Sequence, residues 1–177
     1  WAAAHTGNLT AVSHALRSMV RAAAFFGTHK ENFVADNGDV QGTAVNSSRQ
    51  LWSVAGYLAM VQRVLCGIRT APEGIHFAPA VPDWVRGPLT LSNWRFRGMT
   101  LQVTVVGTGT VVRSLVVDGV ERGAGYVLPA ASTGRHSVRV ALAPAGSAGT
   151  INLVDARQTT PDETFVRTRH TGTVDAS

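Results

Sequence analysis

The sequence predicts an α+β fold in which helices come first and strands follow. In residues 8–26 and 48–66, apolar side chains recur at steps of three and four, which is the period of a helix with a buried stripe. After Gly67 the apolar residues alternate or form short runs, and these are separated by turn sequences. The change of period divides the chain into a helical part and an all-β part.

The first predicted helix covers residues 8–26, NLTAVSHALRSMVRAAAFF. Its apolar stripe consists of Leu9, Val12, Leu16, Met19, Val20 and Ala23. Asn8 or Thr10 can cap its start, and Gly27 can end it. We therefore expect one amphipathic helix with well-marked ends.

The second predicted helix runs from about Ser48 to Cys66, with Ser47 or Ser48 as the cap and Gly67 as the stop. Its apolar residues are Leu51, Val54, Ala55, Leu58, Val61, Val64 and Leu65, and Trp52, Tyr57 and Met60 add to them. A helix that is apolar on most sides needs cover on more than one face. We expect the chain to be the end of a larger helical assembly, either cut or paired with another chain.

The second half predicts a small antiparallel β-sandwich. Its strands are LTLSNWRF, TLQVTVVG, VVRSLVVDG, SVRVALA and TINLVDA, and turns at residues 107–110, 118–119, 132–134 and 143–149 separate them. The predicted organisation is thus a helical domain over residues 1–68, a C-terminal sandwich over 69–155 and a polar tail over 156–177.

Composition excludes several classes of function. The chain is 45% hydrophobic and 15% charged, as expected of a folded protein, and its Arg residues are scattered rather than clustered, so no nucleic-acid partner is predicted. Cys66 is the one cysteine, and its apolar surroundings predict a buried, inert thiol. No membrane span, metal site or cofactor is predicted, because no apolar run is long enough and no His pair has ligand spacing.

A long polar segment, KENFVADNGDVQGTAVNSSRQLWS, joins the two predicted helices. A solvated turn region is the simplest interpretation, but connections of this length in compact domains are often functional. Arg49, Gln50 and Trp52 can present hydrogen-bond donors beside a flat ring, which suits a sugar, and Asn46 is a further hydroxyl partner. Trp52 can equally be a core residue that packs the hairpin.

Glu31 begins this segment, between Lys30 and Asn32. A carboxylate at the rim of a cleft can activate water as a general base. The alternative is an exposed surface Glu paired with Lys30.

Residues 31–60, ENFVADNGDVQGTAVNSSRQLWSVAGYLAM, resemble the closing hairpin of (α/α)6-barrel glycosidases. The nearest group is glycoside hydrolase family 63 with its bacterial six-hairpin relatives, often labelled glycogen-debranching or α-glucosidase-like. The shared pattern is Glu31-Asn32-Phe33, a turn containing glycine, and the helix start Trp52-Ser53-Val54-Ala55. The resemblance implies that residues 1–68 are the last helical hairpins of an (α/α)6 toroid, with a C-terminal β-sandwich after them.

The resemblance also implies that Glu31 is the general base of an inverting glycoside hydrolase. Its substrate would be an oligosaccharide or polysaccharide, and no cofactor is needed. Inversion requires a second carboxyl group as the general acid. The resemblance places that acid in an upstream segment or a second chain, so residues 1–177 alone are expected to be inactive.

Two other functions remain open from the sequence. One is a non-catalytic module whose sandwich binds carbohydrate or serves a structural role. The other is a related sugar phosphorylase, which would need an anion pocket near the same loop. In an enzyme, Glu31 should face a cleft lined by Trp52 and polar groups; in a binding module, it should point to solvent while aromatic residues gather on the sandwich.

Overall fold

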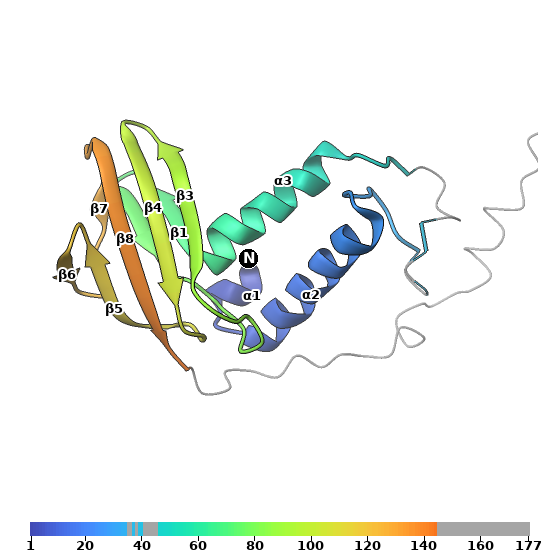
Figure 1. Cartoon of the computed structure of the whole chain (residues 1–177), viewed down its shortest axis with the longest axis horizontal. Coiled ribbons are helices and arrows are strands. Elements are labelled where there is room, and N and C mark those ends of the chain that lie inside the picture. The colour runs from blue at the N-terminus through green and yellow to red at the C-terminus, as the bar shows by residue number, and fades with distance from the viewer. Residues whose placement is uncertain (35–36, 38, 41–45, 145–177) are drawn as a thin grey trace, which may run out of the picture.

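The computed structural model describes residues 1–34, 37, 39–40 and 46–144, and more of these residues lie in strands than in helices (Figure 1). The helical segments are α1 (Ala2–His5), α2 (Leu9–Phe26), α3 (Leu51–Ala59) and the π-helical turn η1 (Met60–Leu65). The strands are β1 (Ile68–Ala71), β2 (Gly74–Phe77), β3 (Leu89–Phe96), β4 (Met99–Val106), β5 (Val111–Val117), β6 (Val120–Arg122), β7 (Leu128–Pro129) and β8 (Gly134–Ala143).

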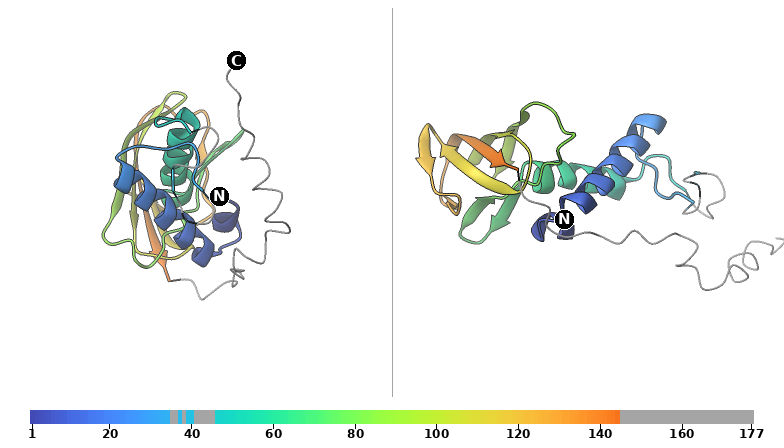
Figure 2. Two further views of the ribbon diagram at one scale, coloured as in Figure 1. Left: turned by 90° about the vertical axis from the view of Figure 1, so that its right-hand side faces the viewer. Right: turned by 90° about the horizontal axis from the view of Figure 1, so that it is seen from below.

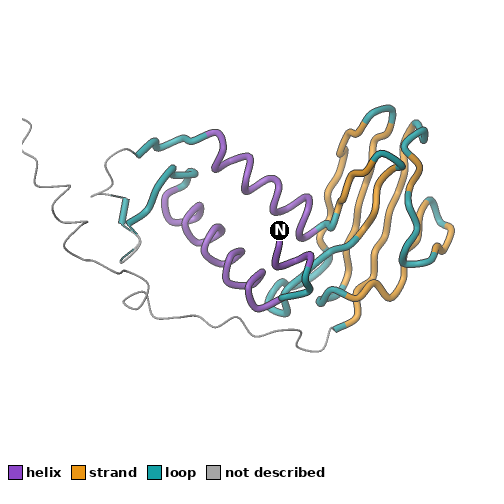
Figure 3. Tube along the Cα trace, turned by 180° about the vertical axis from the view of Figure 1, so that it is seen from behind, coloured by secondary structure: helices purple, strands orange, loops and turns teal. Residues whose placement is uncertain are grey.

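The fold is α+β, but the predicted toroid hairpins over residues 1–68 are wrong. The described chain is built mainly on two β-sheets, and its few helices lie to one side of them (Figures 1 and 3). Val12 and Leu16 of the apolar stripe of α2 are covered within the chain, by Met60 and Val64 of η1 and by Ala80 of the segment that enters the sandwich, while Val20 is 40% exposed. The helical period shows that a face is apolar, and it does not show what covers that face.

Helix α2 confirms the first predicted helix and both of its ends. The Asn8 side chain accepts a hydrogen bond from the Ala11 amide at 3.0 Å, which satisfies one of the unpaired donors of the first turn. At the other end Gly27 has φ of +62°, the left-handed conformation that commonly ends a helix.

The second helix starts at Leu51, three residues later than predicted, and neither Ser47 nor Ser48 caps it. Its N-cap is Gln50, which makes no side-chain cap bond. The two serines are engaged elsewhere: the Ser48 carbonyl accepts from Thr28 at 2.7 Å, and Ser47 pairs with Glu31. The last turns form the wider π-helix, in which the Cys66 amide donates to the Val61 carbonyl, five residues earlier, at 2.9 Å. The helix ends at the predicted Gly67.

The strands form two sheets, with orders β1-β2-β7 and β3-β4-β8-β5-β6, that pack against each other (Figure 2). The prediction of a purely antiparallel sandwich is wrong at one place, because β4 and β8 run parallel, from Met99 beside Gly134 to Val106 beside Ala141. Strand β8 arrives last and inserts between β4 and β5. Alternation identifies a strand's buried face but gives no information about its neighbours.

The main core lies between the two sheets. It combines Ile68, Ile75, Phe77 and Leu128 of the small sheet with Leu101, Val103, Leu115 and Val140 of the large one. Cys66 lies at the helical end of this core with 2% of its surface exposed, and burial raises the pKa of its thiol to about 11. The prediction of a buried, unreactive cysteine is confirmed.

The connecting segment, residues 78–85, ties the helices to the sandwich. The Ala80 amide donates to the Val64 carbonyl at 2.9 Å, and Val81 and Gly109 exchange two backbone hydrogen bonds. The Trp84 indole donates to Ser13 of α2 at 2.7 Å. The segment therefore binds η1, α2 and the β4–β5 turn at once.

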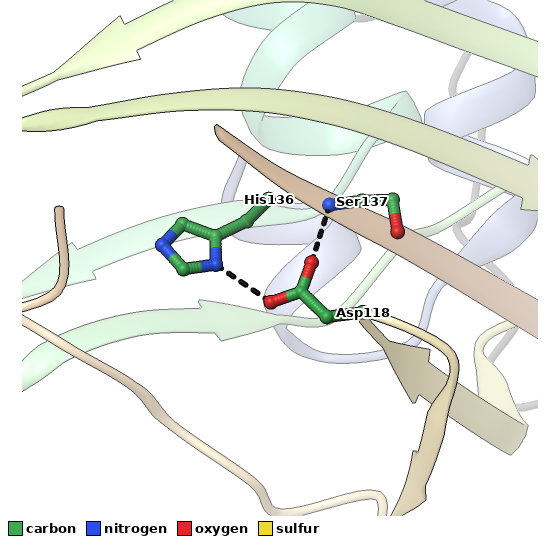
Figure 4. Close-up of polar contacts among 3 residues, drawn as sticks. All are labelled: Asp118, His136 and Ser137. Carbon is green, nitrogen blue, oxygen red and sulfur yellow. Dashed lines mark hydrogen bonds and ion pairs between the residues drawn. The ribbon is translucent and has the colours of Figure 1, made fainter. Parts of the chain in front are cut away.

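A polar contact fixes the tight turn between β5 and β6 against β8 (Figure 4). Asp118 adopts φ of +52° at this turn, and its carboxylate accepts from His136 Nδ1 at 2.7 Å and from the Ser137 amide at 2.8 Å. Partial burial pushes the pKa of Asp118 upward. The two hydrogen bonds, with the positive charges of His136 and Arg122, outweigh that effect and hold the pKa below its ordinary value.

We predict that Gly67→Ala destabilises the fold much more than Gly27→Ala. Both glycines have positive φ, +65° and +62°, so either alanine is strained by about 1 to 2 kcal/mol. At Gly67 an added Cβ would also lie 2.0 Å from the Pro79 nitrogen, whereas nothing lies within 4 Å at Gly27. Denaturant unfolding should show a loss of about 3 kcal/mol or more for Gly67→Ala. Equal losses for the two variants would contradict the close approach of the backbone at Gly67.

We also predict a loss of stability in acid that depends on Asp118. Because its folded-state pKa is lowered, Asp118 stabilises the fold above its unfolded pKa, about 3.9, and this contribution is lost as pH falls through the lower folded value. The melting temperature of Asp118→Asn should therefore fall less than that of the wild type between about pH 5 and pH 2. Asp83→Asn, at an exposed carboxylate with no hydrogen-bond donor among the described residues, is the control and should follow the wild type. Parallel melting curves for all three proteins would refute the assignment.

Candidate functional site

The candidate site lies where the two arms of the loop between α2 and α3 meet, beyond the ends of the helices that are far from the sheets (Figure 1). The first arm is residues 28–34 and the second is residues 46–50. Backbone bonds join them: the Glu31 amide donates to the Ser47 carbonyl at 3.1 Å, and the Gln50 amide donates to the His29 carbonyl at 3.1 Å. The arms therefore hold the segment around Glu31 in a fixed position, although much of the loop between them lies outside the described residues.

Glu31 is partly buried and oriented by the second arm. Its Oε2 accepts a hydrogen bond from the Ser47 amide at 3.0 Å, so residues 31 and 47 are linked twice. Its Oε1 has no hydrogen-bond partner among the described residues. A carboxylate held at one oxygen and open at the other can accept a proton from a bound water molecule.

Glu31 lines a cavity of about 240 Å³ between α2, α3 and the first arm of the loop. The lining consists of Met19, Ala22, Ala23, Thr28, His29, Lys30, Glu31, Phe33, Ser53 and Gly56. Small residues on α2 and Gly56 on α3 leave the space open, and polar groups from the loop border it. Glu31 therefore borders a concave, partly polar surface, but the expected Trp52 is not part of its lining.

His29 and Lys30 also border this cavity, and sequence reasoning did not select them as site residues. Lys30 donates from Nζ to the Ser48 hydroxyl at 3.1 Å and makes no ion pair with Glu31, so the suggested surface pair does not form. The His29 ring lies 4.8 Å from the ring of Tyr57, centroid to centroid. Both residues lie within three positions of Gly27, and this closeness to the end of the helix is the sequence feature that could have indicated them.

Trp52 does not line the cavity, contrary to the expected arrangement for an enzyme. It lies in the first turn of α3 with 64% of its surface exposed, and it is not a core residue either. Ser53 and Gly56 are the residues of α3 that line the cavity, and Trp52 is not among the lining residues. The structure therefore separates Trp52 from Glu31.

The other predicted sugar contacts lie near the site but outside the cavity lining. The Asn46 amide group is engaged with the first arm, donating to the Asn32 and Val40 carbonyls at 2.9 and 3.0 Å and accepting from the Asn32 amide. Gln50 is half-buried at the N-cap of α3, and Arg49 is exposed. Asn46 holds the loop together, while the Gln50 and Arg49 side chains stand at its surface.

Among the described residues, no three His, Cys, Asp or Glu side chains gather in a way that could hold a metal ion. Of the described residues that line the cavity, only Glu31 carries a carboxylate. Asp36, the nearest acid in the sequence, lies outside the described residues.

The described helices are too short or too polar to cross a bilayer. In comparisons with known proteins, no family model matches the chain, and no curated protein matches it at a significant level.

Proposed function

We propose that this chain supplies the general base, Glu31, for hydrolysis of a glycosidic bond with inversion. The substrate is an oligosaccharide or polysaccharide, and Glu31 takes a proton from the attacking water. The observation that supports this proposal is the partly buried Glu31 carboxylate, held at Oε2 by the Ser47 amide and bordering a cavity with polar groups. Trp52, the predicted stacking residue, is not among the lining residues, and Phe33 contributes an aromatic ring to the lining.

Inversion needs a second carboxyl group about 6.5–9.5 Å from the base to protonate the leaving oxygen. The described lining offers only Glu31. The proposal takes this acid from an upstream segment or a second chain, as the resemblance to six-hairpin glycosidases implies. Large apolar side chains on α3 are consistent with such a partner, because Leu51 and Leu58 are 79% and 51% exposed.

We predict that Glu31→Gln lowers kcat of the complete protein by about 100- to 10,000-fold with a smaller effect on KM. Glutamine keeps an oxygen that can accept from the Ser47 amide, so the melting temperature should change little. Kinetics on oligosaccharides measure the effect. Glu73→Gln is the control, because Glu73 is an exposed glutamate in the turn between β1 and β2. Unchanged kcat in Glu31→Gln would reject Glu31 as the base.

A second variant separates catalysis from positioning. Glu31→Ala opens space for a small nucleophile, and azide needs no base to attack a sugar carbon. Sodium azide should therefore restore turnover in Glu31→Ala and form a glycosyl azide. If the variant stays inactive with azide while it binds substrate normally, Glu31 has a structural role and the proposal is wrong.

The phosphorylase alternative has one feature in its favour, since Lys30 places a cation on the same cavity. Product analysis with and without inorganic phosphate distinguishes the two reactions. A free sugar as the product in both cases supports hydrolysis, and a sugar phosphate formed only with phosphate supports phosphorolysis. We also expect residues 1–177 alone to show no turnover, because the acid is supplied from elsewhere.

A further inference from the structure

The outer face of the five-stranded sheet carries an unusual set of side chains. Residues that alternate with the core positions of β3, β4 and β8 point away from the small sheet. Apart from the apolar Val106 and Ala141 at one end of β4 and β8, they form the basic face, which we define as Thr90, Arg95, Thr100, Gln102, Thr104, Arg135, Ser137 and Arg139. All are polar, and the three arginines, Gln102 and Ser137 are exposed.

Register places these side chains in three rows across the sheet. Thr100 lies between Arg95 and Arg135, Gln102 lies beside Ser137, and Thr104 lies between Thr90 and Arg139. Strand geometry puts the Cα atoms of Arg95 and Arg135 about 10 Å apart across β4, and those of Arg135 and Arg139 about 13 Å apart along β8. The arginines thus occupy three corners of a flat polar surface, with hydroxyl and amide groups between them.

None of these arginines is neutralised within the described chain. Arg135 donates to the Asn93 side chain at 3.4 Å, and no described carboxylate pairs with any of the three. Two described acids lie on the β5–β6 side of this face. The Asp118 carboxylate accepts from the Ser137 amide at 2.8 Å and from His136 at 2.7 Å. Glu121 lies beyond Val116 at the β6 edge, where it accepts from Ser114 at 3.1 Å. The charge on this face is complementary to an anionic partner.

We propose that the basic face binds an acidic polysaccharide, a chain of sugars that bear carboxylates. Guanidinium groups bind carboxylates with two parallel hydrogen bonds, and the Thr, Ser and Gln side chains between them suit sugar hydroxyls. Single-stranded nucleic acid fits less well, because the basic face has no aromatic side chain on which bases could stack. A flat sheet face also cannot enter a groove of duplex DNA. This proposal does not rest on the role of Glu31.

The test is affinity electrophoresis of the full chain in gels that contain polygalacturonate, neutral dextran or no polymer. We expect polygalacturonate to retard the wild type, dextran to have no effect, and added salt to reduce the retardation. The triple variant Arg95→Gln/Arg135→Gln/Arg139→Gln should bind about tenfold more weakly, since exposed ion pairs are individually weak and three are lost.

The control is Arg21→Gln/Arg63→Gln/Arg86→Gln, which removes three exposed arginines outside the basic face and changes the net charge equally. It should lose less than about twofold in affinity, because exposed charges far from the ligand are screened. Equal losses in both triple variants would show attraction by net charge alone and overturn the proposal. Tighter binding to a thymidine oligonucleotide than to polygalacturonate, or no retardation of the wild type, would overturn it as well.

Glu31→Gln should bind polygalacturonate as the wild type does. If it binds normally but hydrolysis of neutral oligosaccharides is unchanged, the proposed catalytic role fails and the binding face stands. If it loses hydrolysis while the basic-face triple variant binds normally, the binding proposal fails and the catalytic role stands.

Discussion

The structure depends on the backbone contact between residues 78–85 and the turn at Gly67. The Ala78 amide donates to the Gly67 carbonyl at 2.8 Å, and Pro79 lies so close to Gly67 that a side chain cannot be accommodated there. This approach turns the chain from η1 into β1 and directs residues 78–85 back along the helices. Without this contact, Ala80 could not bond to Val64, and it could not cover the part of α2 that lies near the sandwich.

The same contact determines where the molecule is tightly packed and where it is open. Close to the sandwich, Val12, Leu16 and Val64 are almost fully buried around Ala80. Toward the loop, α3 has no buried residue, and Phe25 at the end of α2 is 81% exposed. The helices therefore share a core at one end and leave a cavity at the other. Glu31 lies at that open end because its loop connects the helix ends that the sandwich does not reach.

Local elements were largely predictable from the sequence, whereas their partners were not. The Asn8 cap, the Gly27 end and strands β3, β4, β5 and β8 follow from short-range patterns that report each segment's own geometry. The parallel pairing of β4 with β8 and the cover that Ala80 gives to α2 depend on residues far apart in the sequence. The prediction of toroid hairpins over residues 1–68 was wrong for this reason, because an apolar stripe is equally compatible with a further helix or with a sandwich junction. Strand TINLVDA and the tail at 156–177 lie outside the described residues.

The site shows the same limit at the level of single residues. The polar loop and Glu31 could be selected from the sequence, because the loop is long and polar and its Glu31-Asn32-Phe33 motif resembles that of six-hairpin glycosidases. Ser47 and Ser48 were predicted as caps of the second helix, but they bind the first arm of the loop and α3 begins only at Leu51. That choice depends on contacts across the loop, which no local pattern reports. The hydrogen bond that orients Glu31 therefore engages the backbone amide of one of the two predicted caps.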